Sequence, residues 1–215
     1  MSNPLTTVIQ LSAGQDWKEL SPQGSDGLKK EFFSFLAGYK QVEVRAYNSQ
    51  PWYPEVAYFL VCDFDSLERY QNFWHRLSRQ PMLEKYAQVL DIALGVDRTV
   101  DNKIKPGGHD YCSLVKLTLT DKWFSLAPQE KQSLMNELVN AIDVWGERID
   151  VRWLDADAWT DSYTDFLLIQ FTCLREYNEF WRDIRSHPYF SSAFFRFSGT
   201  LLGVRDPLEL TTLTC

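Results

Sequence analysis

The pattern of apolar and polar positions along the chain predicts the same kinds of elements in its first half and in its second half. Two stretches in each half alternate between apolar and polar residues, which is typical of strands with one buried face. These stretches are residues 7–11, 42–47, 113–119 and 149–154. Residues 58–64 and 165–171 are almost continuously apolar, as in a central strand that is buried on both faces. Each half is expected to end with a fourth strand, at residues 89–96 and 197–204.

Helices are expected between these strands. Apolar residues at helical spacing predict a first helix at residues 28–36 and its counterpart at residues 131–142. A second helix is expected after Ser66 and after Thr172, because each hydroxyl residue precedes apolar residues at helical spacing and can serve as an N-cap. The resulting order of strand, helix, strand, strand, helix, strand is that of a ferredoxin-like unit.

The two halves are copies of one another, aligned with a shift of 106 to 108 residues. Tryptophans recur at matching places in three pairs, which are Trp17 with Trp123, Trp52 with Trp159, and Trp74 with Trp181. We therefore predict an α+β protein in which two fused ferredoxin-like (βαββαβ) repeats form a dimeric α/β barrel within one chain. Both helices of such a repeat cover one face of its sheet, so the second copy is available to cover the other face.

The expected domain boundaries follow from the repeat. The first ferredoxin-like repeat is predicted at residues 1–97 and the second at residues 111–206, with a C-terminal tail at residues 207–215. A linker is predicted at residues 98–110, because its run Pro106-Gly107-Gly108 favours a turn over a regular element.

Composition and charge exclude several classes of partner. The formal net charge of -7 argues against nucleic acid, since binding to phosphate backbones requires a basic surface. There is no run of about 18 apolar residues and the cysteines lack metal-site spacing, so neither a membrane segment nor a metal site is expected. Aromatic residues make up 15% of the chain and suit both a core and a pocket for a flat ligand. We expect a cytoplasmic protein whose partner is a small apolar or aromatic molecule, and self-association into a homo-oligomer is left open.

Three runs in the second half, at residues 122–130, 151–159 and 164–169, resemble the darcynin family. The resemblance covers residues 111–204 and extends more weakly to residues 6–96. It implies dimeric α/β barrel units, and it carries over no activity residue by residue. The wider group of dimeric α/β barrels includes cofactor-free monooxygenases, polyketide cyclases, small decarboxylases and isomerases, and haem enzymes such as chlorite dismutase. The resemblance therefore leaves the reaction open.

Arg45 and Arg152 occupy matching places in the two halves. Each alternates with a valine along its strand, so each is expected on the sheet face that the helices do not cover. A buried guanidinium needs a partner, and Glu43 and Asp150 lie nearby on the same strands. The sequence supports two interpretations, an internal ion pair and an anchor for the carboxylate or phenolate of a ligand.

One histidine and two polar differences between the halves give further candidates. His187 precedes a proline, so it is expected on a loop, where an imidazole could be exposed, act as a general base or bind haem iron. Asp165 replaces Tyr58, and Thr200 replaces Ile92, at strand positions that are expected to be at least partly covered. Buried polar groups are costly unless they are hydrogen-bonded, so either a ligand cavity or a closed hydrogen-bond network would explain both.

Three functions are compatible with this sequence. The leading hypothesis is an enzyme without a cofactor, an oxygenase, cyclase or isomerase that acts on an aromatic or polyketide-like metabolite. In it, His187 or Asp165 moves a proton and Arg152 holds an anionic oxygen. The predicted substrate-binding residues are Trp159, Tyr163, Arg45 and Thr200. The alternatives are a haem protein with His187 or His75 as axial ligand, and a ligand-binding protein without catalytic activity.

Overall fold

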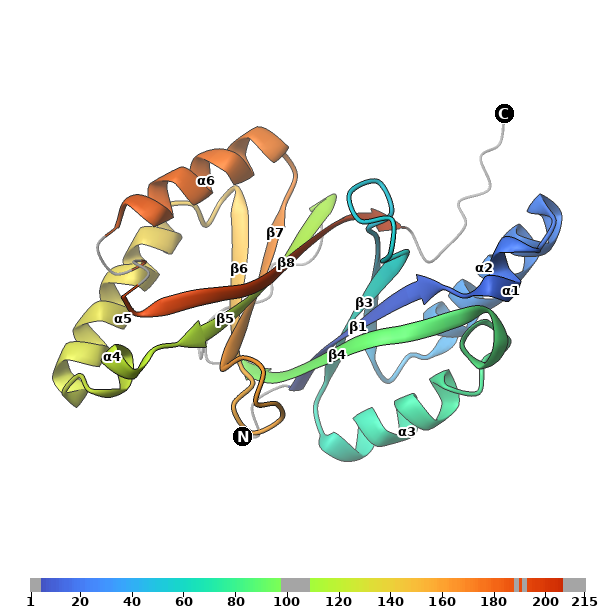
Figure 1. The fold of residues 1–215 in the computed structure, drawn as a ribbon, viewed down its shortest axis with the longest axis horizontal. Helices are drawn as coiled ribbons and strands as arrows, with labels where there is room; N and C mark the ends of the chain where they lie inside the picture. The colour runs from blue at the N-terminus through green and yellow to red at the C-terminus, as the bar shows by residue number, and fades with distance from the viewer. Residues whose placement is uncertain (1–4, 98–108, 188–189, 191–192, 207–215) are drawn as a thin grey trace. The chain divides into compact units, whose positions relative to one another are not determined.

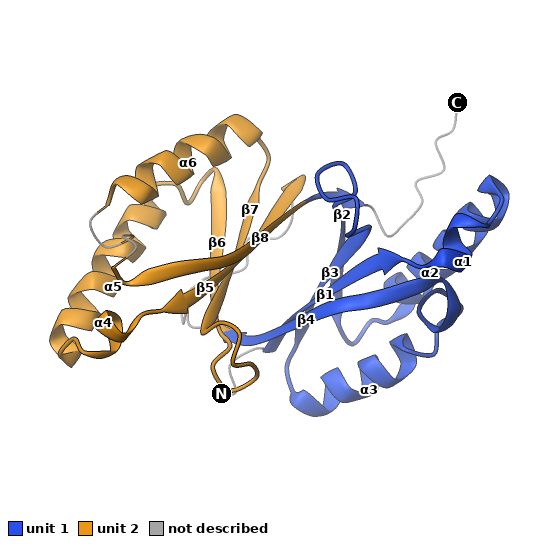
Figure 2. Cartoon of the chain, in the orientation of Figure 1, with its two compact units in different colours: residues 1–96, 203–215 blue, residues 97–202 orange. Residues whose placement is uncertain are grey.

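The computed structural model describes residues 5–97, 109–187, 190 and 193–206 (Figure 1). The chain divides into two compact units: unit 1 contains residues 1–96 and 203–215, and unit 2 contains residues 97–202 (Figure 2). The predicted C-terminal tail and most of the predicted linker lie outside the described residues. Each unit combines a β-sheet with helices, as predicted for an α+β protein.

Unit 1 contains the strands β1 (Leu5–Ala13), β2 (Glu43–Asn48), β3 (Tyr58–Phe64) and β4 (Ala87–Asp97). Its helices are α1 (Gln15–Lys18), α2 (Pro22–Gly38) and α3 (Leu67–Leu77), and a short π-helix, η1 (Met82–Tyr86), precedes β4. The strands pair antiparallel in the order β4-β1-β3-β2. The last residues of β8 (Phe195–Asp206) also pair with β2, and Asp206 lies opposite Ala46.

Unit 2 contains the strands β5 (Tyr111–Leu119), β6 (Ile149–Asp155), β7 (Asp165–Phe171) and the first part of β8. Its helices are α4 (Asp121–Phe124), α5 (Pro128–Asp143) and α6 (Leu174–Ser186). β7 pairs antiparallel with both β5 and β6, and β8 lies next to β5. The predicted order of the main strands and helices is therefore present in both units.

The longer helices of each unit pack on one face of its sheet (Figure 1). In unit 1, Ile9 of β1 belongs to the same apolar core as Phe33 of α2 and Phe73 of α3. In unit 2, Ile169 of β7 and Phe180 of α6 belong to the corresponding core. Such a core forms because alternate residues of a strand point to the same face of the sheet. None of the described helices is both long and apolar enough to cross a membrane.

The two predicted N-caps have different outcomes. Ser66 caps α3, and its hydroxyl accepts a hydrogen bond from the backbone N–H of Arg69 at 3.3 Å, so this prediction is confirmed. The N-cap of α6 is Cys173 and not Thr172, and the side chain of Cys173 makes no capping hydrogen bond. The hydroxyl of Thr172 instead lies 3.5 Å from Nδ1 of His109. The helix thus begins one residue later than the hydroxyl pattern predicts.

Candidate functional site

A cavity of about 270 Å³ lies in unit 1, beside α1 and α2 and at the ends of β1 and β2. Its walls are mainly apolar and aromatic. The larger of these side chains are Trp17, Phe32, Phe33, Tyr58, Met82 and Tyr86. A smaller polar set lines the same cavity, consisting of Ser12, Asp26, Lys29, Asn48 and Gln50. An apolar pocket with a few polar groups is the usual form of a small-molecule site in proteins.

The short helix η1 is held close to the start of α1 by a glycine. The backbone N–H of Gly14 donates a hydrogen bond to the carbonyl oxygen of Tyr86 at 2.8 Å. A Cβ atom at Gly14 would lie only 2.9 Å from that oxygen, so a larger residue would push the two segments apart. This close approach fixes the segment that contributes Met82, Tyr86 and Ala87 to the wall of the cavity.

Three polar side chains meet at the edge of the cavity. One carboxylate oxygen of Asp206 accepts a hydrogen bond from the Tyr58 hydroxyl at 2.9 Å and lies 3.1 Å from Nζ of Lys29. The Lys29 ammonium also lies 5.4 Å and 5.1 Å from the ring centroids of Phe33 and Tyr58. A second, more open pocket of about 450 Å³ contains Asp206 and shares Asp26, Lys29 and Phe33 with the first.

The surroundings of this cluster change two pKa values. Burial by itself lowers the pKa of Lys29, but hydrogen bonds and charge interactions with Tyr58 and Asp206 outweigh it, so the pKa lies above its ordinary value. Burial raises the pKa of Tyr58, which keeps its hydroxyl protonated and able to donate. At neutral pH the cluster therefore presents one ammonium and one hydroxyl donor to a single carboxylate.

The corresponding space in unit 2 is filled by larger side chains. In the repeat alignment, Trp153 stands where unit 1 has Ala46, and Phe195 stands where unit 1 has Ala87. Both are buried, with ring centroids 5.8 Å apart. The indole N–H of Trp153 donates to Asp165 at 2.8 Å, at the place where unit 1 has a tyrosine. This side-chain hydrogen bond gives Asp165 a structural partner, in line with the predicted hydrogen-bond network.

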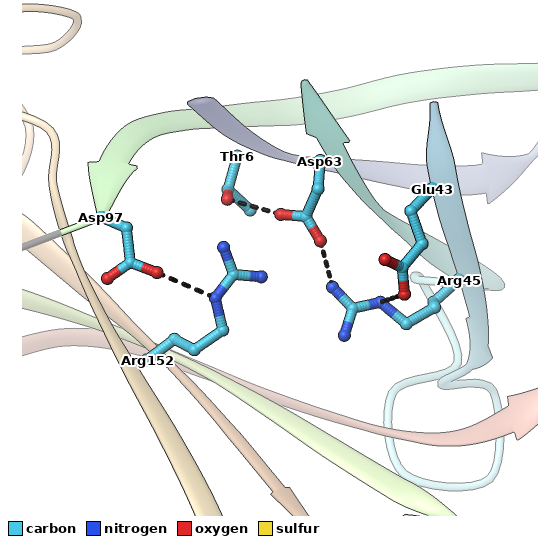
Figure 3. Close-up of polar contacts among 6 residues, drawn as sticks. All are labelled: Thr6, Glu43, Arg45, Asp63, Asp97 and Arg152. Carbon is cyan, nitrogen blue, oxygen red and sulfur yellow. Dashed lines mark hydrogen bonds and ion pairs between the residues drawn. The ribbon is translucent and has the colours of Figure 1, made fainter. Parts of the chain in front are cut away.

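Arg45 and Arg152, which occupy matching positions in the two halves, both form ion pairs with carboxylates (Figure 3). In unit 1, Arg45 is only 7% exposed and its guanidinium bonds Asp63 of the neighbouring strand β3. Nε of Arg45 also lies 3.7 Å from Glu43, the partner that the sequence suggested. The hydroxyl of Thr6 donates to the other oxygen of Asp63 at 2.6 Å. Arg45 thus belongs to a polar network inside unit 1.

In unit 2, Arg152 takes its partner from a different strand (Figure 3). Its side chain is 2% exposed, and its Nε lies 3.1 Å from a carboxylate oxygen of Asp97, the last residue of β4. Gln170 stands where unit 1 has Asp63, so the partner used by Arg45 has no charged counterpart here. Internal ion pairing, one of the two interpretations of these arginines, is therefore observed in both units.

The three predicted catalytic residues are not brought together. Arg152 lies between Val151 and Trp153, which both belong to the core under the helices, so its side chain is on the opposite sheet face. Asp165 bonds Trp153 and therefore lies on the helix side. His187 is half-buried at the end of α6, where its backbone N–H bonds the carbonyl oxygen of Ile184.

The predicted substrate-binding residues also occupy separate places. Trp159 is 42% exposed on the loop between β6 and β7, and Thr200 is exposed on β8. Tyr163 is buried, and the ammonium of Lys116 lies 4.8 Å from its ring centroid. None of these residues, nor Arg45, lines the unit 1 cavity. The assignment of these residues to a binding site stays a prediction.

Sequence reasoning missed Lys29, Tyr58 and Asp206, which form the polar edge of the cavity. The comparison of the two halves looked for polar differences, whereas the cavity depends on a difference in side-chain volume. The pair of Ala87, which lines the cavity, with Phe195 is the sequence difference that could have indicated it. Asp206 could not be connected with Lys29 from the sequence, because their contact depends on the pairing of β8 with β2.

No protein family and no curated protein sequence matches the chain. Its fold matches solved structures of the chlorite dismutase of Candidatus Nitrospira defluvii. The enzyme in complex with imidazole is 15% identical, with a TM-score of 0.82 over 96% of this chain and 92% of that chain. A variant in complex with cyanide is 13% identical, with a TM-score of 0.81 and the same coverage of 96% and 92%. Another variant is 15% identical, with a TM-score of 0.82 over 97% and 93%.

These matches change two predictions from the sequence. They support the wider fold group that contains chlorite dismutase, but they give no support to the darcynin family in particular. The expectation of a protein without a cofactor is wrong, because the matched structures are chlorite dismutases, which are haem enzymes, and they point to haem instead. Of the functions expected from the sequence, the haem-protein alternative is therefore supported better than the leading hypothesis of a cofactor-free enzyme.

Neither of the two pockets of unit 1 has the residues of a haem site. His75 is exposed on α3, His109 and His187 are half-buried, and none of the three lines either pocket of unit 1. Tyrosine can bind haem iron, but the Tyr58 hydroxyl is bonded to Asp206 and its raised pKa disfavours the phenolate. A cavity of about 150 Å³ holds benzene, so 270 Å³ is too small for a macrocycle of four pyrrole rings.

The fold and the site therefore give different information. The fold match spans nearly the whole chain, whereas the cavity is confined to unit 1 and has a lining that does not suit haem. At the identities found, the match establishes the architecture alone. The chain is an α+β protein with the fold of chlorite dismutase.

Proposed function

We propose that the protein binds a small aromatic molecule in the unit 1 cavity. The observation that carries this proposal is the lining, in which five aromatic side chains surround a space bordered by Lys29 and Tyr58. A cavity of about 150 Å³ accepts benzene, so a cavity of about 270 Å³ suits a molecule of one or two rings. The proposal retains the predicted class of partner and locates its site in unit 1, whereas most of the predicted site residues lie in unit 2.

The second unit supplies a natural control for this proposal. Ala87 lines the unit 1 cavity, and phenylalanine stands at the matching position 195 of unit 2. The substitution Ala87→Phe therefore gives unit 1 the residue that unit 2 has at this position. The phenyl group should occupy the cavity and remove ligand binding. Ala37→Phe is the matched control, because Ala37 lies on the exposed side of α2 and does not line the cavity.

The probe for this experiment is 2-naphthoate, a two-ring aromatic acid, and the measurement is the shift in thermal unfolding with probe concentration. A ligand that binds only the folded state raises the unfolding temperature. We expect the shift in the wild type and in Ala37→Phe and its loss in Ala87→Phe. Ala87→Met fills less of the cavity, so this variant should retain part of the shift in unfolding temperature. Equal shifts in all four proteins would show that the probe binds elsewhere.

A haem-binding protein is the second candidate, and the match to chlorite dismutase favours it. Because neither pocket of unit 1 suits haem, its test starts from the chain as a whole. Haemin is added to the purified protein and the Soret absorption is recorded for the wild type, His187→Ala and His75→Ala. A Soret band that shifts in one histidine variant would support haem binding through that residue. A spectrum equal to that of haemin alone in all three proteins would reject it.

We also propose that the two units form the fused dimeric α/β barrel that the repeat predicts. One observation supports it. The matched chlorite dismutase structures cover 96% of this chain, which includes both units.

A further inference from the structure

Two hydrogen-bond donors from different elements converge on one oxygen at the edge of the unit 1 cavity. Lys29 comes from α2 and Tyr58 from the first position of β3, and both reach the same carboxylate oxygen of Asp206, at 3.1 Å and 2.9 Å. An ammonium and a hydroxyl directed at one oxygen form a carboxylate-binding pair, since charge-assisted hydrogen bonds are the stronger kind. Asp206 is the carboxylate that occupies this pair.

The position of Asp206 makes it replaceable. It is the last residue of β8, its side chain is 20% exposed, and that of Lys29 is 34% exposed. Ion pairs that are open to solvent hold their partners weakly. A carboxylate from a bound molecule could therefore take the place of the Asp206 side chain without breaking a buried pair.

The aromatic walls place a ring next to the same ammonium. Lys29 and Phe33 line both pockets, and the Lys29 ammonium lies within 5.4 Å of the Phe33 ring centroid and 5.1 Å of the Tyr58 ring centroid. A flat ring that fills the cavity thus has its acid group within reach of Lys29. Two further charged side chains border the pockets, Asp26 with a negative charge and Lys30 with a positive charge, so together they add no net charge.

We infer that the ligand of this cavity is an aromatic acid, and that Asp206 is an internal competitor that occupies the position of its carboxylate in the free protein. This inference rests on the proposed function and gives it a substrate class. It also gives the end of β8 a role in setting affinity, because the strand pairing of Asp206 with Ala46 holds the competing carboxylate in place.

The test compares 2-naphthoate with its neutral counterpart, 2-naphthamide, by isothermal titration calorimetry. Asp206→Asn removes the competing charge with little change in shape, and Asp206→Ala removes the side chain beyond its Cβ atom. Both variants should bind 2-naphthoate about tenfold more tightly than the wild type, because one hydrogen bond to a charged group contributes about that factor. The affinity for 2-naphthamide should change much less. Adding Lys29→Met to Asp206→Asn should reverse the gain.

Glu31→Gln is the matched control, since it removes one negative charge from an exposed position of α2 that does not line either pocket. It should leave the affinity for 2-naphthoate unchanged. Equal gains in Glu31→Gln and Asp206→Asn would overturn the inference, because net charge alone would then explain the effect. A thermal unfolding curve for each variant confirms that it is folded before titration.

The outcomes separate this inference from the proposed function. If Asp206→Asn and Asp206→Ala bind 2-naphthoate no more tightly than the wild type, while Ala87→Phe still blocks it, the cavity binds aromatic molecules and the competitor role of Asp206 is wrong. If neither 2-naphthoate nor 2-naphthamide binds the wild type or the Asp206 variants, the proposed function fails as well.

Discussion

At the scale of single residues, Arg45 and Arg152 are both buried and pair with carboxylates from different positions in the fold. Arg45 bonds Asp63 on the neighbouring strand, whereas Arg152 bonds Asp97 at the end of β4. Both guanidinium groups are almost fully buried, so each needs a charged partner to offset the loss of water. The ion pairs supply these partners, and a role for either arginine in ligand binding stays a prediction.

The Arg152–Asp97 pair gives a residue-scale prediction. Asp97→Ala removes a carboxylate that contacts the buried guanidinium of Arg152 and should lower the free energy of unfolding by about 3 kcal/mol, because taking one charged partner from a buried ion pair is costly. Asp65→Ala is the control, since Asp65 pairs with Arg69 in an exposed i,i+4 contact of 2.9 Å. That exposed pair should contribute less than about 1 kcal/mol. The measurement is urea-induced unfolding, and equal losses in both variants would show that Asp97 is not the main partner of Arg152.

At the scale of helices and strands, most of the fold could be predicted from the sequence. Periodicity identifies an element over its whole length, so the main strands and helices were found in the right order in both units. The ends depend on single contacts and were less accurate. Ser66 caps α3 as predicted, whereas α6 begins after Cys173 and Thr172 faces His109 instead.

The candidate site could not be predicted in the same way. Ala87 lines the cavity on β4, and the larger Phe195 stands at the matching position in unit 2. A single alanine in the sequence gives no sign of a cavity. Only the packing of the strands and helices shows that Ala87 lines the same space as Lys29.

At the scale of the whole chain, β8 runs through both compact units. The second repeat is predicted at residues 111–206, and residues 203–206 of that range lie in unit 1. The strand begins at Phe195 in unit 2 and ends at Asp206 in unit 1. The repeat alignment could not show this, because it compares each half with the other and contains no information about which strand continues into which sheet.

Gly203 is the residue at which β8 enters unit 1, and it gives a prediction for the whole chain. A Cβ atom at this position would lie 2.6 Å from Cε1 of Phe59 and 2.8 Å from Cβ of Tyr47. Those two rings are fully buried and stacked with centroids 5.0 Å apart, so neither can move aside easily. Gly203→Ala should therefore lower the free energy of unfolding by about 1 to 3 kcal/mol, the usual cost of overpacking.

Gly199 provides the matched control on the same strand, because a Cβ atom there would meet no other atom within 4 Å. Gly199→Ala should change the free energy of unfolding by less than about 0.5 kcal/mol, as exposed substitutions usually do. Because Asp206 follows Gly203 on β8, a strand pushed away from Tyr47 should also release the carboxylate from Lys29. Gly203→Ala should then bind 2-naphthoate more tightly than Gly199→Ala when both are folded. A stable Gly203→Ala protein with wild-type affinity would show that β8 enters unit 1 without the close contact on which both effects depend.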